Sequence, residues 1–188
     1  MKELSLHLLD IAENSLTAGA TEVSLGLRLT NAGVLFLKVQ DNGRGIDVEK
    51  LRQIENPFFT TRTTRNVGLG VPLLKQHAEM TGGKVEIRSN PGKGTEITAR
   101  FHIWHPDIQP LGDLEGCWML LAVANNEANI LLNCETPGGS FRIGSAEVKR
   151  ELELEDLQDA EIRADLKALI RNNLEDIGLT NRKIAYKK

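Results

Sequence analysis

At residues 39–46 the chain reads Val39-Gln40-Asp41-Asn42-Gly43-Arg44-Gly45-Ile46, with one carboxylate and two glycines directly after an apolar run typical of a buried strand. Asp and Gly are common in turns, so this stretch alone predicts only a tight loop after a strand. Asn14 lies upstream of it, and Gly68-Leu69-Gly70 lies downstream at the start of a predicted helix. This ordered set favours a binding site around the turn at Asp41.

The composition is that of an ordinary globular protein, with 188 residues, 40% hydrophobic and 26% charged. This length allows one domain with an appendage or two small domains. A net charge of −3 supplies no basic footprint for DNA or RNA, so we expect no nucleic-acid partner. The sequence contains no apolar run of about 18 residues, and its acidic start, Met1-Lys2-Glu3-Leu4, is unlike a secretory signal. We therefore expect a soluble, cytoplasmic protein without a membrane partner. Cys117 and Cys134 lie in apolar surroundings, which predicts buried thiols.

Hydrophobic periodicity predicts the elements of the first part of the chain. Apolar residues recur at three- and four-residue spacing over residues 3–18, which predicts a helix with His7, Asp10 and Asn14 on its polar side. The other predicted elements are strands over 22–29 and 34–39, a short helix over 47–54, a helix over 71–80, and strands over 84–88 and 96–101. Together they predict a sheet with helices, complete by about His105.

Pro106 and Pro110 mark a predicted boundary, so we divide the chain into a domain over 1–105 and a small C-terminal α+β extension over 106–188. The extension's predicted elements are helices over 111–125, 146–154 and 156–177, and a hairpin with strands over 128–134 and 140–143. Its amphipathic, acidic last helix favours a docking or dimerisation role, so a homodimer is possible.

The motifs have the chemistry of a nucleotide site. The Asp41 carboxylate can accept a hydrogen bond from the exocyclic amine of adenine, while a water or the Thr95 hydroxyl serves the rest of the base. Gly43 and Gly45 would let the backbone approach base and sugar without a Cβ clash. The segment Gly68-Leu69-Gly70, leading into a helix, offers backbone N–H groups and a positive helix end to a triphosphate.

Asn14 has two interpretations. Its amide oxygen is a suitable ligand for Mg²⁺, which prefers an octahedral shell of oxygens that includes phosphates and waters. By itself, it would be interpreted as a solvated residue on a helix face. Opposite a phosphate-binding loop, the magnesium interpretation is favoured.

Residues 1–104 resemble the GHKL superfamily, the ATP-binding fold of histidine kinases, type II topoisomerases, the heat-shock chaperone and mismatch-repair ATPases. The matching motifs are Asp10-Ile11-Ala12-Glu13-Asn14-Ser15 (N box), Asp41-Asn42-Gly43-Arg44-Gly45 (G1 box), Pro57-Phe58-Phe59-Thr60-Thr61 (F box), Gly68-Leu69-Gly70 (G2 box) and the turn Gly92-Lys93-Gly94-Thr95. The resemblance implies an α/β two-layer sandwich, a mixed β-sheet with helices on one face (the Bergerat fold), which binds ATP and Mg²⁺ beneath a lid between Ile46 and Val67.

Within the implied lid, Arg62 and Arg65 are candidates for contacts to the phosphates, and the alternative is that they are simply solvated. Phe58 and Phe59 would pack the lid against the core.

The candidate general base is Asp10. ATP-hydrolysing members of the superfamily carry Glu four residues before the N-box asparagine, whereas histidine kinases carry Asn there. Asp10 is one methylene shorter than Glu; it could activate a water or a hydroxyl, or it could orient His7 one turn earlier.

Glu13 is a weaker candidate for the base, since it points about 100 degrees away from Asn14 around the helix. Only 13 residues precede Asn14, so we expect no helical hairpin with a phosphoacceptor histidine. We therefore expect an enzyme, an ATP-dependent kinase-like protein or slow ATPase, acting on a separate protein partner. The alternative is a non-catalytic regulatory module that responds to ATP or ADP.

Overall fold

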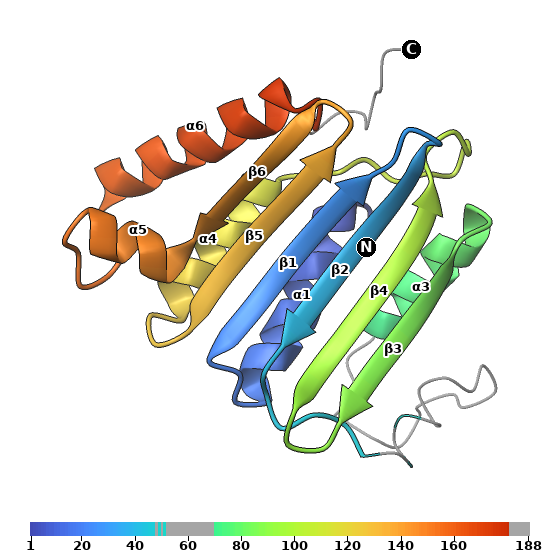
Figure 1. The fold of residues 1–188 in the computed structure, drawn as a ribbon, viewed down its shortest axis with the longest axis horizontal. Coiled ribbons are helices and arrows are strands. Elements are labelled where there is room, and N and C mark those ends of the chain that lie inside the picture. The colour runs from blue at the N-terminus through green and yellow to red at the C-terminus, as the bar shows by residue number, and fades with distance from the viewer. Residues whose placement is uncertain (48, 50, 52–69, 181–188) are drawn as a thin grey trace.

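The backbone of the computed structural model forms one mixed sheet of six strands in the order β3-β4-β2-β1-β5-β6 (Figure 1). The structure describes residues 1–47, 49, 51 and 70–180. The strands are β1 (Glu22–Leu29), β2 (Val34–Asp41), β3 (Lys84–Asn90), β4 (Gly94–His102), β5 (Asn129–Thr136) and β6 (Gly139–Gly144). Most of the predicted short helix over 47–54 and of the predicted lid lies outside the described residues.

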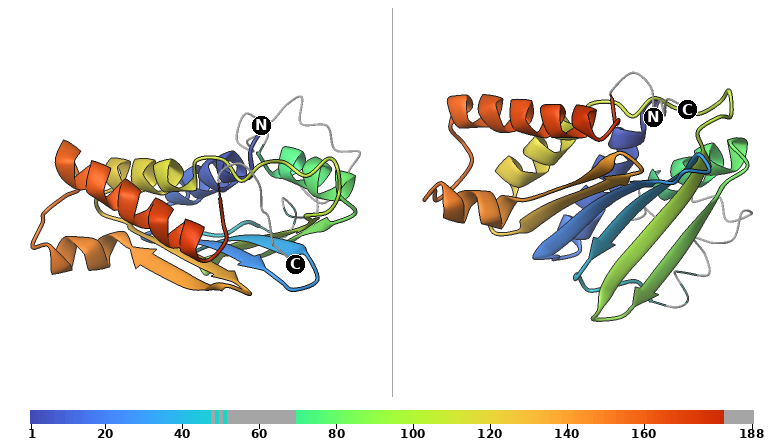
Figure 2. Two further views of the ribbon diagram at one scale, coloured as in Figure 1. Left: turned by 90° about the horizontal axis from the view of Figure 1, so that it is seen from above. Right: turned by 45° about the horizontal axis from the view of Figure 1, so that its top comes forward.

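Helices cover one face of this sheet. They are α1 (Leu4–Thr17), α3 (Gly70–Met80), α4 (Leu114–Ala124) and α6 (Ala160–Asp176), while the short α5 (Ser145–Glu151) follows β6. Seen along the sheet, α3, α1, α4 and α6 lie on the same side of the strands (Figure 2). The predicted two-layer sandwich, with a mixed sheet and helices on one face, is therefore confirmed. Among the described residues, no helix combines the length and the apolar character needed to cross a membrane.

The hairpin of β1 and β2 forms the centre of the sheet. Alternate residues of both strands are buried, and they include Leu25, Leu27, Leu35 and Leu37. The antiparallel register places Leu27 opposite Leu37, so the apolar sides of the two strands face the helices together. The predicted alternation is thus the one observed, and β2 runs on to Asp41, at the end of the strand.

The C-terminal part of the chain continues the same sheet. Strand β5 pairs in parallel with β1, and β6 pairs antiparallel with β5. The connecting segment before α4 is joined to the start of α1, because the backbone N–H of Leu4 donates to Pro110 O at 3.0 Å and that of Ser5 donates to Leu111 O at 2.8 Å. The sheet therefore continues across the boundary that we predict after residue 105. The division of the chain into two domains there stays a prediction.

Two C-terminal helices begin later than the periodicity predicts. Helix α4 begins after Asp113, whose carboxylate accepts from the backbone N–H of Gly116 at 2.8 Å. Helix α6 begins after Asp159, whose carboxylate accepts from the N–H groups of Glu161 and Ile162. Each aspartate satisfies N–H groups that the first helical turn leaves unpaired, so the cap sets the start of the helix.

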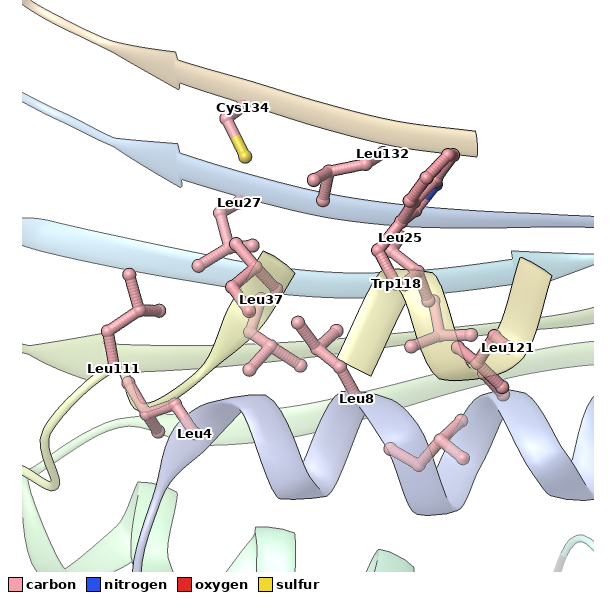
Figure 3. Packing of buried hydrophobic residues seen from close by; sticks show 14 of the residues in the cluster. Leu4, Leu8, Leu25, Leu27, Leu37, Leu111, Trp118, Leu121, Leu132 and Cys134 are labelled. Atoms are coloured by element: carbon pink, nitrogen blue, oxygen red, sulfur yellow. The ribbon is translucent and has the colours of Figure 1, made fainter. Parts of the chain in front are cut away.

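The core joins residues from both parts of the chain. Leu8 of α1, Trp118 of α4 and Leu132 of β5 are fully buried in one apolar cluster (Figure 3). The indole N–H of Trp118 donates to the carbonyl oxygen of Ile130 at 3.1 Å, so its only polar group is satisfied inside the core. Cys117 and Cys134 are buried free thiols, as predicted.

Replacing Leu132 tests whether this core unfolds as one unit. Leu132→Ala should lower the free energy of unfolding by about 2–5 kcal/mol, because it leaves a cavity between β5 and the helices. Urea unfolding followed by tryptophan fluorescence and by far-UV circular dichroism should give coincident single transitions. Leu169→Ala, the same deletion at a side chain 49% exposed, is the matched control and should change stability by less than about 0.5 kcal/mol. Two separate transitions, with only one shifted, would show that the chain folds as two units.

Candidate functional site

The Asp41 side chain is held at the end of β2 by three donors. The Ser15 hydroxyl donates to Oδ2 at 2.7 Å, and the backbone N–H groups of Gly43 and Thr95 donate to Oδ1 at 2.8 and 3.2 Å. These donors come from α1, from the turn after β2 and from β4. The carboxylate therefore has one fixed orientation, set by three elements that are distant in sequence.

Asp41 lies in the wall of a cavity of about 310 Å³ between α1, the strands and the start of α3. Ile11, Val39 and Ile97 contribute apolar surface to it, and Asn14 and Thr95 contribute polar groups. A slot with apolar walls and one anchored carboxylate suits a flat heterocycle that carries an amine. The structure thus brings Asn14, Asp41 and Thr95, predicted as site residues, to one cavity.

Glycines allow close approach of backbone to backbone beside this cavity. Gly45 has φ +71°, and a Cβ there would overlap the carbonyl oxygen of Asn90. Gly94 has φ +91°, and a Cβ there would overlap the carbonyl oxygen of Asp41. Both positions therefore require glycine. For Gly45 the close neighbour is Asn90, at the end of β3, and this constraint adds to the predicted approach to base and sugar.

Asp10, Asn14 and Gly70 meet where α1 faces the start of α3. The side-chain amide of Asn14 donates to the backbone oxygen of Asp10 at 2.8 Å and to its Oδ2 at 3.3 Å, which leaves the Asn14 Oδ1 to act as an acceptor. Gly70 is the first residue of α3, and a Cβ there would overlap the Asp10 carboxylate. A carboxylate therefore lies directly beside the first residue of that helix.

Several predicted site residues lie outside the described part of the chain. They are Arg62, Gly68 and Leu69, together with Phe58, Phe59 and Arg65 of the predicted lid. Their roles stay predictions. Gly43 is described; a Cβ there would lie 3.1 Å from Asp41 Oδ1 and 3.2 Å from the Ala18 oxygen, so this turn is closely packed against the end of α1.

His7 is fully buried, although the sequence places it on the polar side of α1. Its Nε2 lies 3.0 Å from His77 Nδ1 and 3.2 Å from Gln109 Oε1, and the two imidazole rings meet edge to face. The partners of His7 are thus on α3 and on the segment before α4, rather than Asp10. No local sequence pattern links these three residues, since they are separated by 70 and 102 positions.

Burial lowers the pKa of His7 to about 4; Gln109 opposes this shift, and the nearby His77 adds to it. Burial also lowers the pKa of His77. Both rings are therefore neutral at pH 7, and a neutral pair can share one hydrogen bond between helices α1 and α3 without repulsion.

A mixed sheet covered by helices on one face, with a cavity between the first helix and the turn after the second strand, is the α/β sandwich that the sequence predicts. Residues 2–105 match the family described as histidine kinase-, DNA gyrase B-, and HSP90-like ATPase. The match covers more than half of the chain, and the protein belongs to this family.

Two similar proteins are named as kinases. The sensor protein kinase FleS of Pseudomonas aeruginosa is 40% identical over 92 residues, which are 48% of this chain and 23% of that protein. Sporulation kinase D of Bacillus subtilis is 37% identical over 95 residues, which are 48% of this chain and 18% of that protein. The chain thus spans about a fifth of the length of these relatives.

A solved structure supports the fold. The crystal structure of the N-terminal domain of a DNA repair protein superimposes with a TM-score of 0.51 at 14% identity, covering 77% of this chain and 52% of that chain. At this level of identity the likeness concerns the fold alone. It extends well beyond the segment that the family match covers.

The buried His7 should make stability depend on pH. Its pKa is about 4 in the folded protein and 6.5 when exposed, so the unfolded chain binds more protons between these values. The free energy of unfolding should therefore fall by roughly 3 kcal/mol as the pH drops from 6.5 to 4. Urea titrations of the wild type across this range measure the change.

His7→Gln should remove most of this pH dependence, whereas His105→Gln, a change at a partly exposed histidine, should keep it. The assignment to His7 fails if the wild type and His7→Gln lose stability in parallel.

Proposed function

We propose that the cavity at Asp41 binds ATP, with adenine against the carboxylate and the phosphates toward α3. The observation that carries this proposal is the anchoring of Asp41. An ionised carboxylate has about four acceptor positions, and Ser15, Gly43 and Thr95 use three of them. The remaining one suits the exocyclic amine of adenine, and the apolar side chains beside it suit the faces of the ring.

The residues present also fit a magnesium ion that accompanies the phosphates. Asn14 Oδ1 is a neutral oxygen whose orientation is fixed by the two hydrogen bonds that the same amide donates to Asp10. Phosphate oxygens and waters would complete the shell. When bound, Mg²⁺ would neutralise charge on the phosphates and align them.

The proposed activity is transfer of the γ-phosphate to a hydroxyl group of a separate protein, or slow hydrolysis when water takes its place. Asp10 supports this activity, because its carboxylate lies beside Gly70, where the N–H groups of the first turn of α3 would favour a phosphate. There it can accept the proton of the attacking hydroxyl. The similarity to sensor kinases also supports phosphoryl transfer. Because ATP is the proposed substrate, we propose that the protein acts in the cytoplasm.

The alternative is a regulatory module that binds ATP or ADP without chemistry. Asp10 is shorter than the glutamate expected in ATP-hydrolysing relatives, and Asn14 already donates to its carboxylate. The two functions make different predictions for Asp10, and they make the same prediction for Asp41.

Asp41→Asn should weaken ATP binding by about 1–3 kcal/mol, since one charge-assisted hydrogen bond is lost in a part-buried site. The fold should persist, because the remaining amide oxygen can still accept from Gly43 and Thr95. Titration with a fluorescent ATP analogue measures the affinity. Asp165→Asn, the same change at an exposed site on α6, should have no effect. Equal affinities of wild type and Asp41→Asn would contradict this placement of adenine.

Asp10→Asn should lower turnover by about 10²–10⁴-fold, the usual contribution of a general base, while ATP affinity stays within a few-fold. The assay incubates the protein with γ-labelled ATP and Mg²⁺, alone and with candidate partners, and follows both phosphate release and protein labelling. Glu13→Gln, a neighbouring carboxylate on the exposed side of α1, is the matched control and should retain activity. If the wild type shows no turnover with any partner, the regulatory alternative is favoured.

A further inference from the structure

A second cavity lies on the side of α1 that faces α4. It is a groove of about 600 Å³ between α1, α4 and α6. Its apolar surface comes from Leu6, Leu9, Met119, Leu120 and Val123. Two of these side chains are notably exposed, Leu120 at 53% and Leu6 at 36%. An apolar groove with exposed leucines on two helices is a feature of protein interaction sites.

Charges line the groove asymmetrically. On the α6 side, Arg163 and Lys167 lie four residues apart, so they lie on the same side of that helix. Neither forms an ion pair with another described residue. The acidic residues of the lining, Glu3 and Asp113, lie at the starts of α1 and α4. A partner with an acidic edge toward α6 therefore complements this groove.

The walls of the groove determine the backbone conformation of its occupant. All three walls are helices, and beyond the first turn of each helix the backbone N–H groups are bonded within it. An extended peptide would lose water from its own N–H and C=O groups without gaining partners. A helix satisfies these groups internally and can insert an apolar stripe between the leucines.

The groove and the proposed phosphate site lie on adjacent sides of α1. Leu6 lines the groove, and Asp10, one turn further along α1, lies beside Gly70. The other two walls, α4 and α6, belong to the part of the chain that the family match does not cover. These helices therefore add a surface next to the site that the family segment alone would lack.

We infer that the α1–α4–α6 groove docks an amphipathic helix of a protein partner, with its apolar stripe on Leu6 and Leu120 and an acidic edge on Arg163 and Lys167. The docking is independent of the nucleotide. The identification of this partner as the phosphoryl acceptor rests on the proposed function, because it is the proximity of the groove to Asp10 that suggests it.

The test uses the full chain and fluorescent synthetic helices of about 20 residues, about 30 Å long. One peptide carries leucines at helical spacing with glutamates along one edge; a second carries lysines in place of the glutamates; a third carries a central proline. Fluorescence anisotropy, measured without nucleotide, should show binding of the acidic peptide at least tenfold tighter than that of the other two.

Leu120→Glu and Lys167→Glu should each weaken binding of the acidic peptide at least tenfold. The matched controls are Leu169→Glu, at an exposed leucine of α6 that does not line the groove, and Arg142→Glu, on β6; both should bind like the wild type. Asp41→Asn should also bind the peptide normally, which separates failure of the nucleotide site from failure of the docking site.

Three results would overturn the inference. The first is equal binding of the acidic and basic peptides, and the second is binding that Leu120→Glu and Lys167→Glu leave unchanged. The third is a dimer, seen by light scattering, that Leu120→Glu dissociates, because the occupant would then be a second copy of this chain.

Discussion

The carboxylate of Asp41 is the constraint on which the candidate site depends. A charged group that is partly withdrawn from water must find partners, and Asp41 finds them on α1, on the turn after β2 and on β4. At the same corner, Gly94 allows β4 to approach the Asp41 carbonyl oxygen closely, since a Cβ there would overlap that oxygen. The hydrogen bonds that stabilise this corner of the fold therefore also fix the orientation of the Asp41 carboxylate in the wall of the cavity.

Much of the fold could be predicted from local patterns, and the long-range pairing could not. Alternation over residues 22–29 and 34–39 predicted β1 and β2, because a strand with one buried face repeats every two residues. The same reasoning found the hairpin of β5 and β6 but not its neighbour, since alternation does not specify a partner. The parallel pairing of β5 with β1 depends on the crossover through α4. Helix starts were also misplaced where Asp113 and Asp159 act as caps, since apolar periodicity does not locate a cap.

The residues of the candidate site, too, could be predicted only in part from the sequence. Asn14, Asp41 and Thr95 could be named from motifs, and the structure brings them to one cavity although they lie far apart in sequence. The buried contact of His7 with His77 was missed, because each histidine alone looks like a polar residue on a helix surface. The packing of two helices determines whether such a pair forms. The hydrophobic pattern of a single helix does not describe that packing.

Helix α1 lies between the proposed nucleotide site and the groove, and it is fixed at both ends. Near its C-terminal end Ser15 donates to Asp41, and at its N-terminal end the N–H groups of Leu4 and Ser5 donate to the segment before α4. Leu8, between these ends, is fully buried. A helix held in this way resists rotation and translation, so we expect α1 to stay in place when a partner binds in the groove. Docking would then act by holding the partner close to the phosphate site, which raises the effective concentration of the acceptor, rather than by changing the shape of the cavity.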